Sequence, residues 1–304
     1  MRSLGLALGL AAFVSLLCPS SAQGQATFVV ALVELHEATD SYLLQRDALL
    51  VDESLVDEEL AALANHQDWR VRQGADVLTG LRTRPSLHEE IRTAVPAFDR
   101  AGRPRFDLPV MRDPAARAAV VERFLHGGEA APVRAALALS LIGLGGDWDT
   151  LQHRLLAQEQ EAEVRLILVN SMRRAGPSAA RIGLDLGLAD SAPAVRAEAC
   201  RAVGWRSDGD LWAEQLLRAL EDDDSEVQAM AARALGWRQV ASAFGALLPG
   251  LDHASAEVRL HSLRALGRID QRATSVLPAL PQLQRDSDER VSRLAQRLVS
   301  RRAP

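Results

Sequence analysis

The 304-residue chain has no lysine, only two cysteines and one tyrosine, and its aromatic residues amount to 4% of the total. Two cysteines can form at most one disulfide, which excludes a framework of several disulfides. A formal net charge of -5 argues against a protein that binds polyanions over its whole surface. What the chain has instead is alanine and leucine in abundance, within 48% hydrophobic residues, and this composition is typical of a helical protein.

Residues 1–22 have the three parts of a secretory signal peptide. Arg2 precedes an uncharged apolar run from Leu4 to Leu17, which is shorter than the roughly 20 residues that span a bilayer. Small residues follow, and we expect cleavage after Ala22, although Ala26 also fits. The sequence therefore predicts an exported protein, periplasmic or secreted. Lipid anchoring through Cys18 is the less favoured alternative, because Leu17 stands where lipoprotein signals have Gly or Ala.

A phrase of about fifteen residues recurs along the chain. The clear copies are Glu129–Gly143 (EAAPVRAALALSLIG), Asp190–Gly204 (DSAPAVRAEACRAVG), Asp222–Gly236 (DDDSEVQAMAARALG) and Asp252–Gly267 (DHASAEVRLHSLRALG). Weaker copies begin at Asp68, Glu161 and Asp286. Each copy holds one valine at an equivalent position, here called the marker valine: Val71, Val133, Val164, Val195, Val227, Val258 and Val291. Their spacings are 62, 31, 31, 32, 31 and 33 residues, so the period is about 31 residues.

Each period divides into two amphipathic helices. Leu211–Leu220 has apolar residues at steps of three and four, which predicts a first helix with one buried face. The turn Asp222–Ser225 offers side-chain oxygens that cap a second helix. Gly236 is expected to end that helix, as glycine often does. A pair of this size cannot cover its own apolar face, so neighbouring pairs must stack.

The Asp turn, the Val-Arg step and the Ala-Leu-Gly ending resemble the HEAT-repeat family, in particular short bacterial HEAT-like repeats. The resemblance is clear over Glu129–Leu298 and thinner over Ser54–Leu81. It implies an all-α fold, an α-solenoid of stacked antiparallel helix pairs, and protein binding as the usual function.

The chain is predicted to have four segments. They are a signal peptide at 1–22, an N-terminal capping helix with the first helix pair at 27–83, a Pro-rich insertion or degenerate repeat at 84–114, and the repeat array with a C-terminal cap at 115–304. Five of the thirteen prolines lie in residues 84–114, which prevents one continuous helix there. Two alternatives stay open for this segment: a degenerate repeat with one helix near Leu87–Ala94, or an inserted loop.

Arginine follows most of the marker valines, at Arg72, Arg134, Arg165, Arg196 and Arg259, with Gln228 and Ser292 as departures. Residues in the same phase form a row along a solenoid. One interpretation is a cationic strip for an acidic partner. The favoured one is a structural ladder, in which each guanidinium meets a turn carboxylate of a neighbouring repeat, at Asp190, Asp222 or Asp252.

Trp205 and Trp237 both lie in a Gly-Trp-Arg sequence between helix pairs, 32 residues apart. Exposed Trp and Arg together are typical of a protein-binding hot spot. The favoured alternative is packing over the seam between repeats, because tryptophan has a large apolar area to hide.

Sequence motifs for catalysis and metal binding are missing. There is no HExxH, G-x-S-x-G, P-loop or dinucleotide fingerprint, and the acidic run Glu221–Glu226 lacks the glycine and distal glutamate of a calcium loop. The deoxyhypusine hydroxylases, which share the repeat, bind iron through His-Glu pairs just after the Val-Arg step. Here those positions hold no such pair, for example Ala197-Glu198 and Leu260-His261. No enzyme activity, metal or cofactor is predicted, and Cys200 is expected to be a buried structural thiol.

The favoured function is an exported, non-catalytic scaffold that binds a protein partner on its concave surface, lined by the second helices. Polar residues there that lie outside the arginine ladder are the candidate binding residues: Glu198, Arg201, Arg233, His261 and Arg264. The alternatives are an enzyme or maturation factor with a pocket under residues 84–114, and a purely structural envelope component. Nucleic acid is not an expected partner, and no membrane span is expected after signal cleavage.

Overall fold

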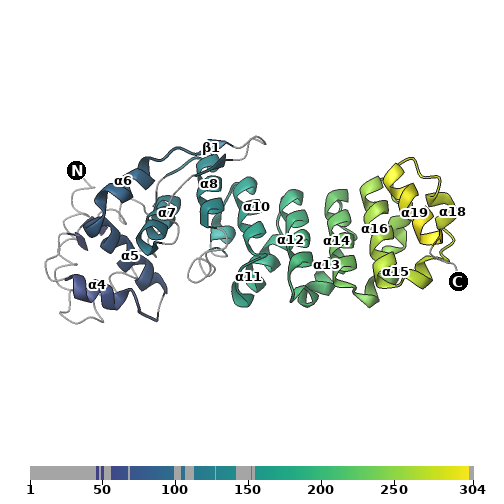
Figure 1. Cartoon of the computed structure of the whole chain (residues 1–304), viewed down its shortest axis with the longest axis horizontal. Helices are drawn as coiled ribbons and strands as arrows, with labels where there is room; N and C mark the ends of the chain where they lie inside the picture. Colours follow the sequence, from purple (N-terminus) through teal and green to yellow (C-terminus); the bar gives the residue numbers. More distant parts are fainter. Residues whose placement is uncertain are drawn as a thin grey trace, which may run out of the picture. The chain divides into compact units, whose positions relative to one another are not determined.

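The computed structural model describes residues 46–47, 49–50, 56–67, 69–98, 104–106, 113–126, 128–141, 152 and 155–300. The chain divides into two compact units, residues 1–141 and 142–304. Apart from two strands of two residues each, the regular elements of the described part are helices (Figure 1). The fold is the predicted all-α solenoid of stacked helix pairs. No helix in this part of the chain is both long and apolar enough to cross a membrane.

The first unit is built from five described helices, α4 (Asp57–Leu63), α5 (Trp69–Thr83), α6 (Pro85–Thr93), α7 (Pro114–His126) and α8 (Ala131–Leu141). Helix α5 packs against α4, α6 and α7, and α7 packs in turn against α6 and α8. The core between them is formed by fully buried side chains such as Val71, Leu78 and Val120. The predicted signal peptide and most of the predicted capping helix at Thr27–Leu50 lie outside the described residues.

The Pro-rich segment combines the two alternatives that the sequence leaves open. It begins with α6, where Pro85 occupies a first-turn position that needs no backbone donor. After α6 comes an antiparallel hairpin of β1 (Ala97–Phe98) and β2 (Pro104–Arg105). Arg123 of α7 joins this helix to the C-terminal end of α6, because its Nη1 donates to the carbonyls of Ile91 and Ala94 at 2.6 and 2.8 Å.

The second unit is a row of helix pairs. Its described elements are α10 (Ala162–Ser171), α11 (Pro177–Leu188), α12 (Pro193–Trp205), η1 (Gly209–Trp212), α13 (Ala213–Ala219), α14 (Ser225–Arg238), η2 (Ala241–Ala243), α15 (Phe244–Leu247), η3 (Pro249–Asp252), α16 (Ala256–Ile269), α17 (Gln271–Thr274), α18 (Leu280–Leu283) and α19 (Glu289–Ser300). The second helices α10, α12, α14, α16 and α19 lie side by side, and each packs on the next (Figure 1). The first helices α11, α13 and α15 form a separate row beneath them in the same view. The face formed by the second helices is called the second-helix face below.

Repeat-phase residues explain why these helices stack. The five marker valines of this unit, from Val164 to Val291, are buried, and Cys200 is a fully buried free thiol, as predicted. Within the predicted capping turn Asp222–Ser225, Asp224 is the N-cap of α14, since its side chain accepts from the amides of Glu226 and Val227. The buried alanines of α12 and α14 leave room for close helix approach.

Two local predictions are wrong. Gly236 does not end its helix: α14 continues to Arg238 and ends at Gln239, which has a left-handed backbone with φ of 52°. Gly236 instead lies where α14 approaches α16, and a Cβ there would be 2.5 Å from the Cα of Ala265. Leu211 is not on the buried face, because it is 59% exposed while its neighbour Trp212 is fully buried. The reason is that residues 209–212 form a 3-10 turn before α13, which rotates Leu211 away from the core.

Candidate protein-binding surface

The arginines that follow the marker valines clamp the turn before their own helix. Nη1 of Arg165, Arg196 and Arg259 donates in each case to two successive carbonyls of that turn, over 2.6–3.2 Å. Arg72 bonds the carbonyls of His66 and Gln67, and Arg134 bonds that of Glu129. In the second unit the same guanidinium also reaches the next repeat. There Nε and Nη2 bond both carboxylate oxygens of one aspartate, in the pairs Arg165–Asp190, Arg196–Asp222 and Arg259–Asp286, at 2.7–2.9 Å.

The aspartates of these pairs have a second structural role. The carboxylates of Asp190, Asp222 and Asp286 also cap the turn that starts the next helix, and their pKa values are held below the ordinary value. For Asp222 and Asp286 the hydrogen bonds from arginine are the main cause; for Asp190, burial opposes the shift and the Arg165 bonds prevail. Bidentate, partly buried pairs of this kind have the geometry expected of a structural ladder.

One repeat lacks the ladder pair, because both the arginine and the aspartate are replaced by other residues. Gln228 replaces the arginine and donates to the carbonyl of Asp222. The residue equivalent to Asp190 in the following turn is His253, whose Nδ1 accepts from the amide of Ser255. Asp252 is therefore not the acceptor that the sequence suggested. Because the arginine and the carboxylate are both replaced, no buried charge is left alone.

A second set of arginines was not recognised from the sequence. Arg206 is buried and donates to the carbonyls of Met172 and Ala175, at the end of the previous second helix. Arg238 does the same one repeat later, to the carbonyls of Arg206 and Ser207. The sequence signal for these arginines is the repeated Gly-Trp-Arg, in which Arg206 and Arg238 follow the two tryptophans. Like the ladder, these arginines are tied into backbone and aspartate partners.

The second-helix face carries a different row of arginines. Arg201, Arg233 and Arg264 each stand six residues after a marker valine, on the adjacent helices α12, α14 and α16. All three are half-buried. Of these, Arg201 pairs with Glu198, its Nε lying 2.7 Å from Oε2. Arg233 and Arg264 have no hydrogen bond or ion pair to a carboxylate among the described residues.

Two other predicted binding residues, Glu198 and His261, are buried and stand three residues after their marker valines. Glu198 also accepts a hydrogen bond from Asn170 of α10, so it links two second helices. His261 Nε2 lies 3.6 Å from Glu257, and its buried Nδ1 has no hydrogen-bond partner. Both residues are thus more buried than the three arginines and do not themselves form the outer surface.

Trp205 and Trp237 lie beside this row. Their ring centroids are 4.6 Å apart in an edge-to-face arrangement. The guanidinium of Arg233 lies 4.2 Å from the centroid of Trp237, that of Arg268 lies 5.9 Å from it, and Arg173 lies 5.4 Å from Trp205. Trp205 is 55% exposed, so the favoured prediction of a packed tryptophan is wrong for it. Trp212, in contrast, is fully buried and donates to Asp185.

The side chains Arg201, Arg233, Arg264, Arg268, Trp205 and Trp237 are called the basic–aromatic patch below. Its positive charge is only weakly compensated. Burial lowers the pKa of Arg233, and repulsion from Arg201 and Arg264 lowers it further. The pKa of Arg268 is lowered by burial and then by Arg264 and Arg233. Burial, followed by Arg264 and Arg233, lowers the pKa of His261 to about 4, so this imidazole is neutral at pH 7.

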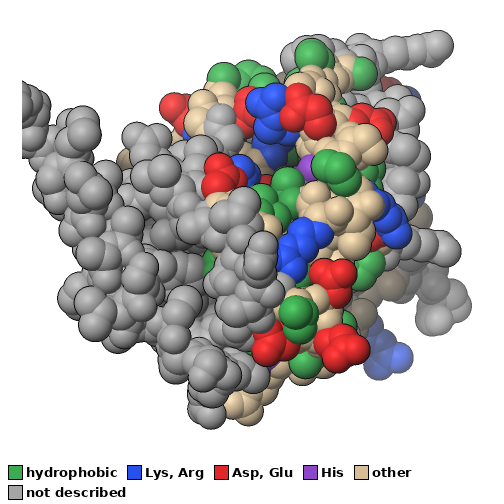
Figure 2. Space-filling model, turned by 90° about the vertical axis from the view of Figure 1, so that its left-hand side faces the viewer, with side chains coloured by type: hydrophobic (Ala, Val, Ile, Leu, Met, Phe, Trp, Pro, Cys, Tyr) green, Lys and Arg blue, Asp and Glu red, His purple; other side chains and the backbone are tan. Residues whose placement is uncertain are grey.

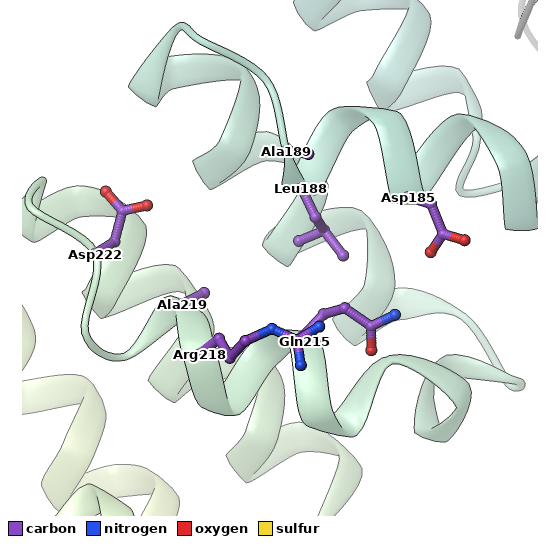
Figure 3. Close-up of a pocket in the computed structure, with 7 residues that line it drawn as sticks. All are labelled: Asp185, Leu188, Ala189, Gln215, Arg218, Ala219 and Asp222. Carbon is purple, nitrogen blue, oxygen red and sulfur yellow. The ribbon is translucent and has the colours of Figure 1, made fainter.

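A pocket opens on the other helix row, between α11 and α13 (Figure 3). Its volume is about 380 Å³, and Asp185 and Leu188 face Gln215 and Arg218 across it. Asp222 at its edge is already engaged by Arg196. Its acids and bases show no nucleophile–base pair of the kind that catalysis uses.

The first unit holds a buried polar cluster near the Pro-rich segment. Glu122 accepts from Arg46 at 3.0 Å and lies 3.6 Å from Nδ1 of His88. Burial is the main cause that lowers the pKa of His88.

The face of this unit turned toward the viewer in Figure 2 intersperses acidic and basic side chains. Across the described residues no group of three or more His, Cys, Asp or Glu side chains is placed to hold a metal ion. Residues 99–103 and 107–112 of the Pro-rich segment lie outside the described residues, so the alternative of a pocket under this segment stays a prediction.

Comparison with known proteins gives one family match. Residues 183–244 match the family described as HEAT repeats. This stretch contains α12, α13 and α14, and therefore Arg201, Arg233 and both patch tryptophans. No curated protein matches the sequence.

Solved structures of helical repeat proteins are similar to the chain at low identity. The E. coli protein YibA is 15% identical, over 84% of this chain and 94% of that one, with a TM-score of 0.48. A designed armadillo repeat protein is 14% identical over 81% and 99%, with a TM-score of 0.36. Human deoxyhypusine hydroxylase in complex with glycerol is 14% identical over 81% and 98%, with a TM-score of 0.36.

Proposed function

We propose that this chain is an exported, non-catalytic helical-repeat scaffold that binds a protein partner on the second-helix face. The observation that carries the proposal is the contrast between two rows of arginines. Those of the ladder in the second unit are saturated by aspartate and backbone acceptors, whereas Arg233 and Arg264 meet no carboxylate among the described residues. Arginine beside exposed tryptophan is the composition of protein-binding hot spots.

Export is supported by residues 1–22, whose charged start, apolar run and small-residue ending form a secretory signal. Fractionation of the producing cells, followed by N-terminal sequencing, tests this part. A mature chain that begins at Gln23 outside the cytoplasm is the expected result. A cytoplasmic chain that still begins with Met1 would contradict it.

Binding is tested by affinity purification of the full chain, tagged at its C-terminus and produced in its own host. The informative variant is Arg233→Glu/Arg264→Glu, which reverses two charges of the patch. Its matched control is Arg218→Glu/Arg272→Glu, which reverses two exposed arginines outside the second-helix face. Circular dichroism and thermal unfolding establish that all forms are folded.

A protein retained by the native chain and by the control, but lost by the patch variant, is the expected outcome. If the patch variant retains the same protein, the second-helix face is not the binding surface. If nothing specific is retained by the native chain, the proposal of a protein-binding scaffold fails.

A further inference from the structure

The arginines of the basic–aromatic patch that lack an acidic partner among the described residues indicate the chemistry of the ligand that the patch would bind. Arg233, Arg264 and Arg268 gather on α14 and α16 with no acidic acceptor among the described residues, and Arg173 has a buried Nε with no hydrogen-bond partner. By contrast, the ladder arginines Arg165, Arg196 and Arg259 of the same unit, which are also partly buried, are each bound to an aspartate. A guanidinium fork is suited to bidentate recognition of a carboxylate.

The spacing of the row specifies the conformation. Packed helices lie about 8–10 Å apart, so equivalent side chains on α12, α14 and α16 repeat at roughly that interval. In an extended strand side chains alternate between two faces, so residues three apart point to opposite sides. One three-residue turn of polyproline II covers about 9 Å and brings every third side chain back to the same face. A peptide in the polyproline II conformation that crosses the second helices therefore presents every third side chain to the row Arg201, Arg233, Arg264.

We propose that the basic–aromatic patch binds an extended acidic segment of the partner protein that carries a carboxylate at about every third residue. This rests on the proposed function and gives the partner a chemical class. Arg233 and Arg264 bind the central carboxylates, since Arg201 already shares Glu198. The exposed ring of Trp205 covers an apolar or proline residue between two acidic ones.

The direct probe is a fluorescein-labelled peptide of four Glu-Pro-Ala triplets, titrated with the full chain at low and at physiological salt. A peptide of identical composition with its four glutamates consecutive is the control for spacing. A single-stranded oligonucleotide with four phosphates is the control for anions of another class. Fluorescence anisotropy gives the three dissociation constants without any substitution in the protein.

We expect the triplet peptide to bind more tightly than both controls, and its binding to weaken as salt rises. Arg233→Gln and Arg264→Gln should each raise its dissociation constant by about three- to tenfold, the scale expected for one partly exposed ion pair. The exposed Arg218, on α13, gives the matched control Arg218→Gln, which should leave binding within about twofold.

Three outcomes overturn the inference. They are no binding of the triplet peptide, equal binding of the two peptides, and tighter binding of the oligonucleotide. The proposed scaffold function is tested separately by the affinity purification. It is retained if a partner protein is lost from the Arg233→Glu/Arg264→Glu variant, whichever peptide result is found.

Discussion

At the scale of single residues, arginine does three kinds of work in this chain. In the ladder it closes the turn before its own helix and reaches an aspartate of the next repeat. In Gly-Trp-Arg it satisfies carbonyls at the end of the previous second helix. In the basic–aromatic patch Arg233 and Arg268 lie over Trp237, and Glu198 is the one carboxylate among the described residues that is bonded to a patch arginine. The same residue type is structural or available for binding according to whether the chain supplies its acceptor.

The ladder pair Arg196–Asp222 is expected to stabilise the fold. Arg196→Gln leaves a partly buried carboxylate without its fork, and should lower the free energy of unfolding by about 1–3 kcal/mol. Urea unfolding at pH 7 measures this. Adding Asp222→His recreates the natural combination of Gln228 and His253, so part of the loss should return. Strictly additive losses in the double variant would contradict the pairing.

His261 makes stability depend on pH. Its pKa is lowered to about 4 by burial and by Arg264 and Arg233, against about 6.5 in the unfolded chain. Since the unfolded state takes up the proton first, this contribution is complete above pH 6.5 and is lost as the pH falls toward 4. Between those values the wild type should lose more free energy of unfolding than His261→Gln. Urea midpoints at several pH values test it, and parallel curves for the two proteins would refute it.

At the scale of elements, close helix approach organises the second unit. Small residues and buried marker valines bring α12, α14 and α16 together, and Gly236 marks the tightest point between the last two. The period of 31 residues, the paired helices and the capping turn Asp222–Ser225 could all be predicted, because they follow from local patterns that repeat. The position of Gly236 inside α14 could not, since its role depends on the backbone of Ala265 in another repeat.

Trp205 shows a similar limit of local patterns. Whether a tryptophan at a helix end is covered depends on which residue the next repeat places beside it. Trp237 has Arg233 and Arg268 about its ring, while Trp205 meets Trp237 at an edge and stays 55% exposed. The five predicted binding residues lie on the second helices α12, α14 and α16, but Glu198 and His261 are buried there whereas the three arginines are half-buried. That they bind a partner stays a prediction.

Gly236→Ala should destabilise the protein by about 1–3 kcal/mol, because its methyl group would force α14 and α16 apart. Gly245→Ala in α15 is the matched control, since nothing lies within 4 Å of a Cβ there. That change should be neutral or stabilising by up to about 1 kcal/mol. Denaturant midpoints of the two variants give the comparison. Equal effects would show that the helix contact at Gly236 is unimportant.

At the scale of the whole molecule, the repeat lets one residue position become a surface. The arginines six residues after a marker valine repeat on adjacent helices at about 8–10 Å, which is about the length of one three-residue turn of polyproline II. The second unit carries this surface on its second helices, and the pocket with Arg218 on the first helices. The proposed function therefore predicts that a partner contacts the second helices of this unit and not its first helices.

Site-specific photo-crosslinking in the producing cells tests that assignment most directly. A photoreactive amino acid replaces Met230, which shares a stripe of α14 with Arg233 and Trp237, or Gln215, which lies on α13 beside the pocket. A discrete protein adduct from position 230, absent from position 215 and lost when Arg233→Glu/Arg264→Glu is added, is the predicted result. An adduct from position 215 alone, or one from position 230 that survives the charge reversal, would contradict the account.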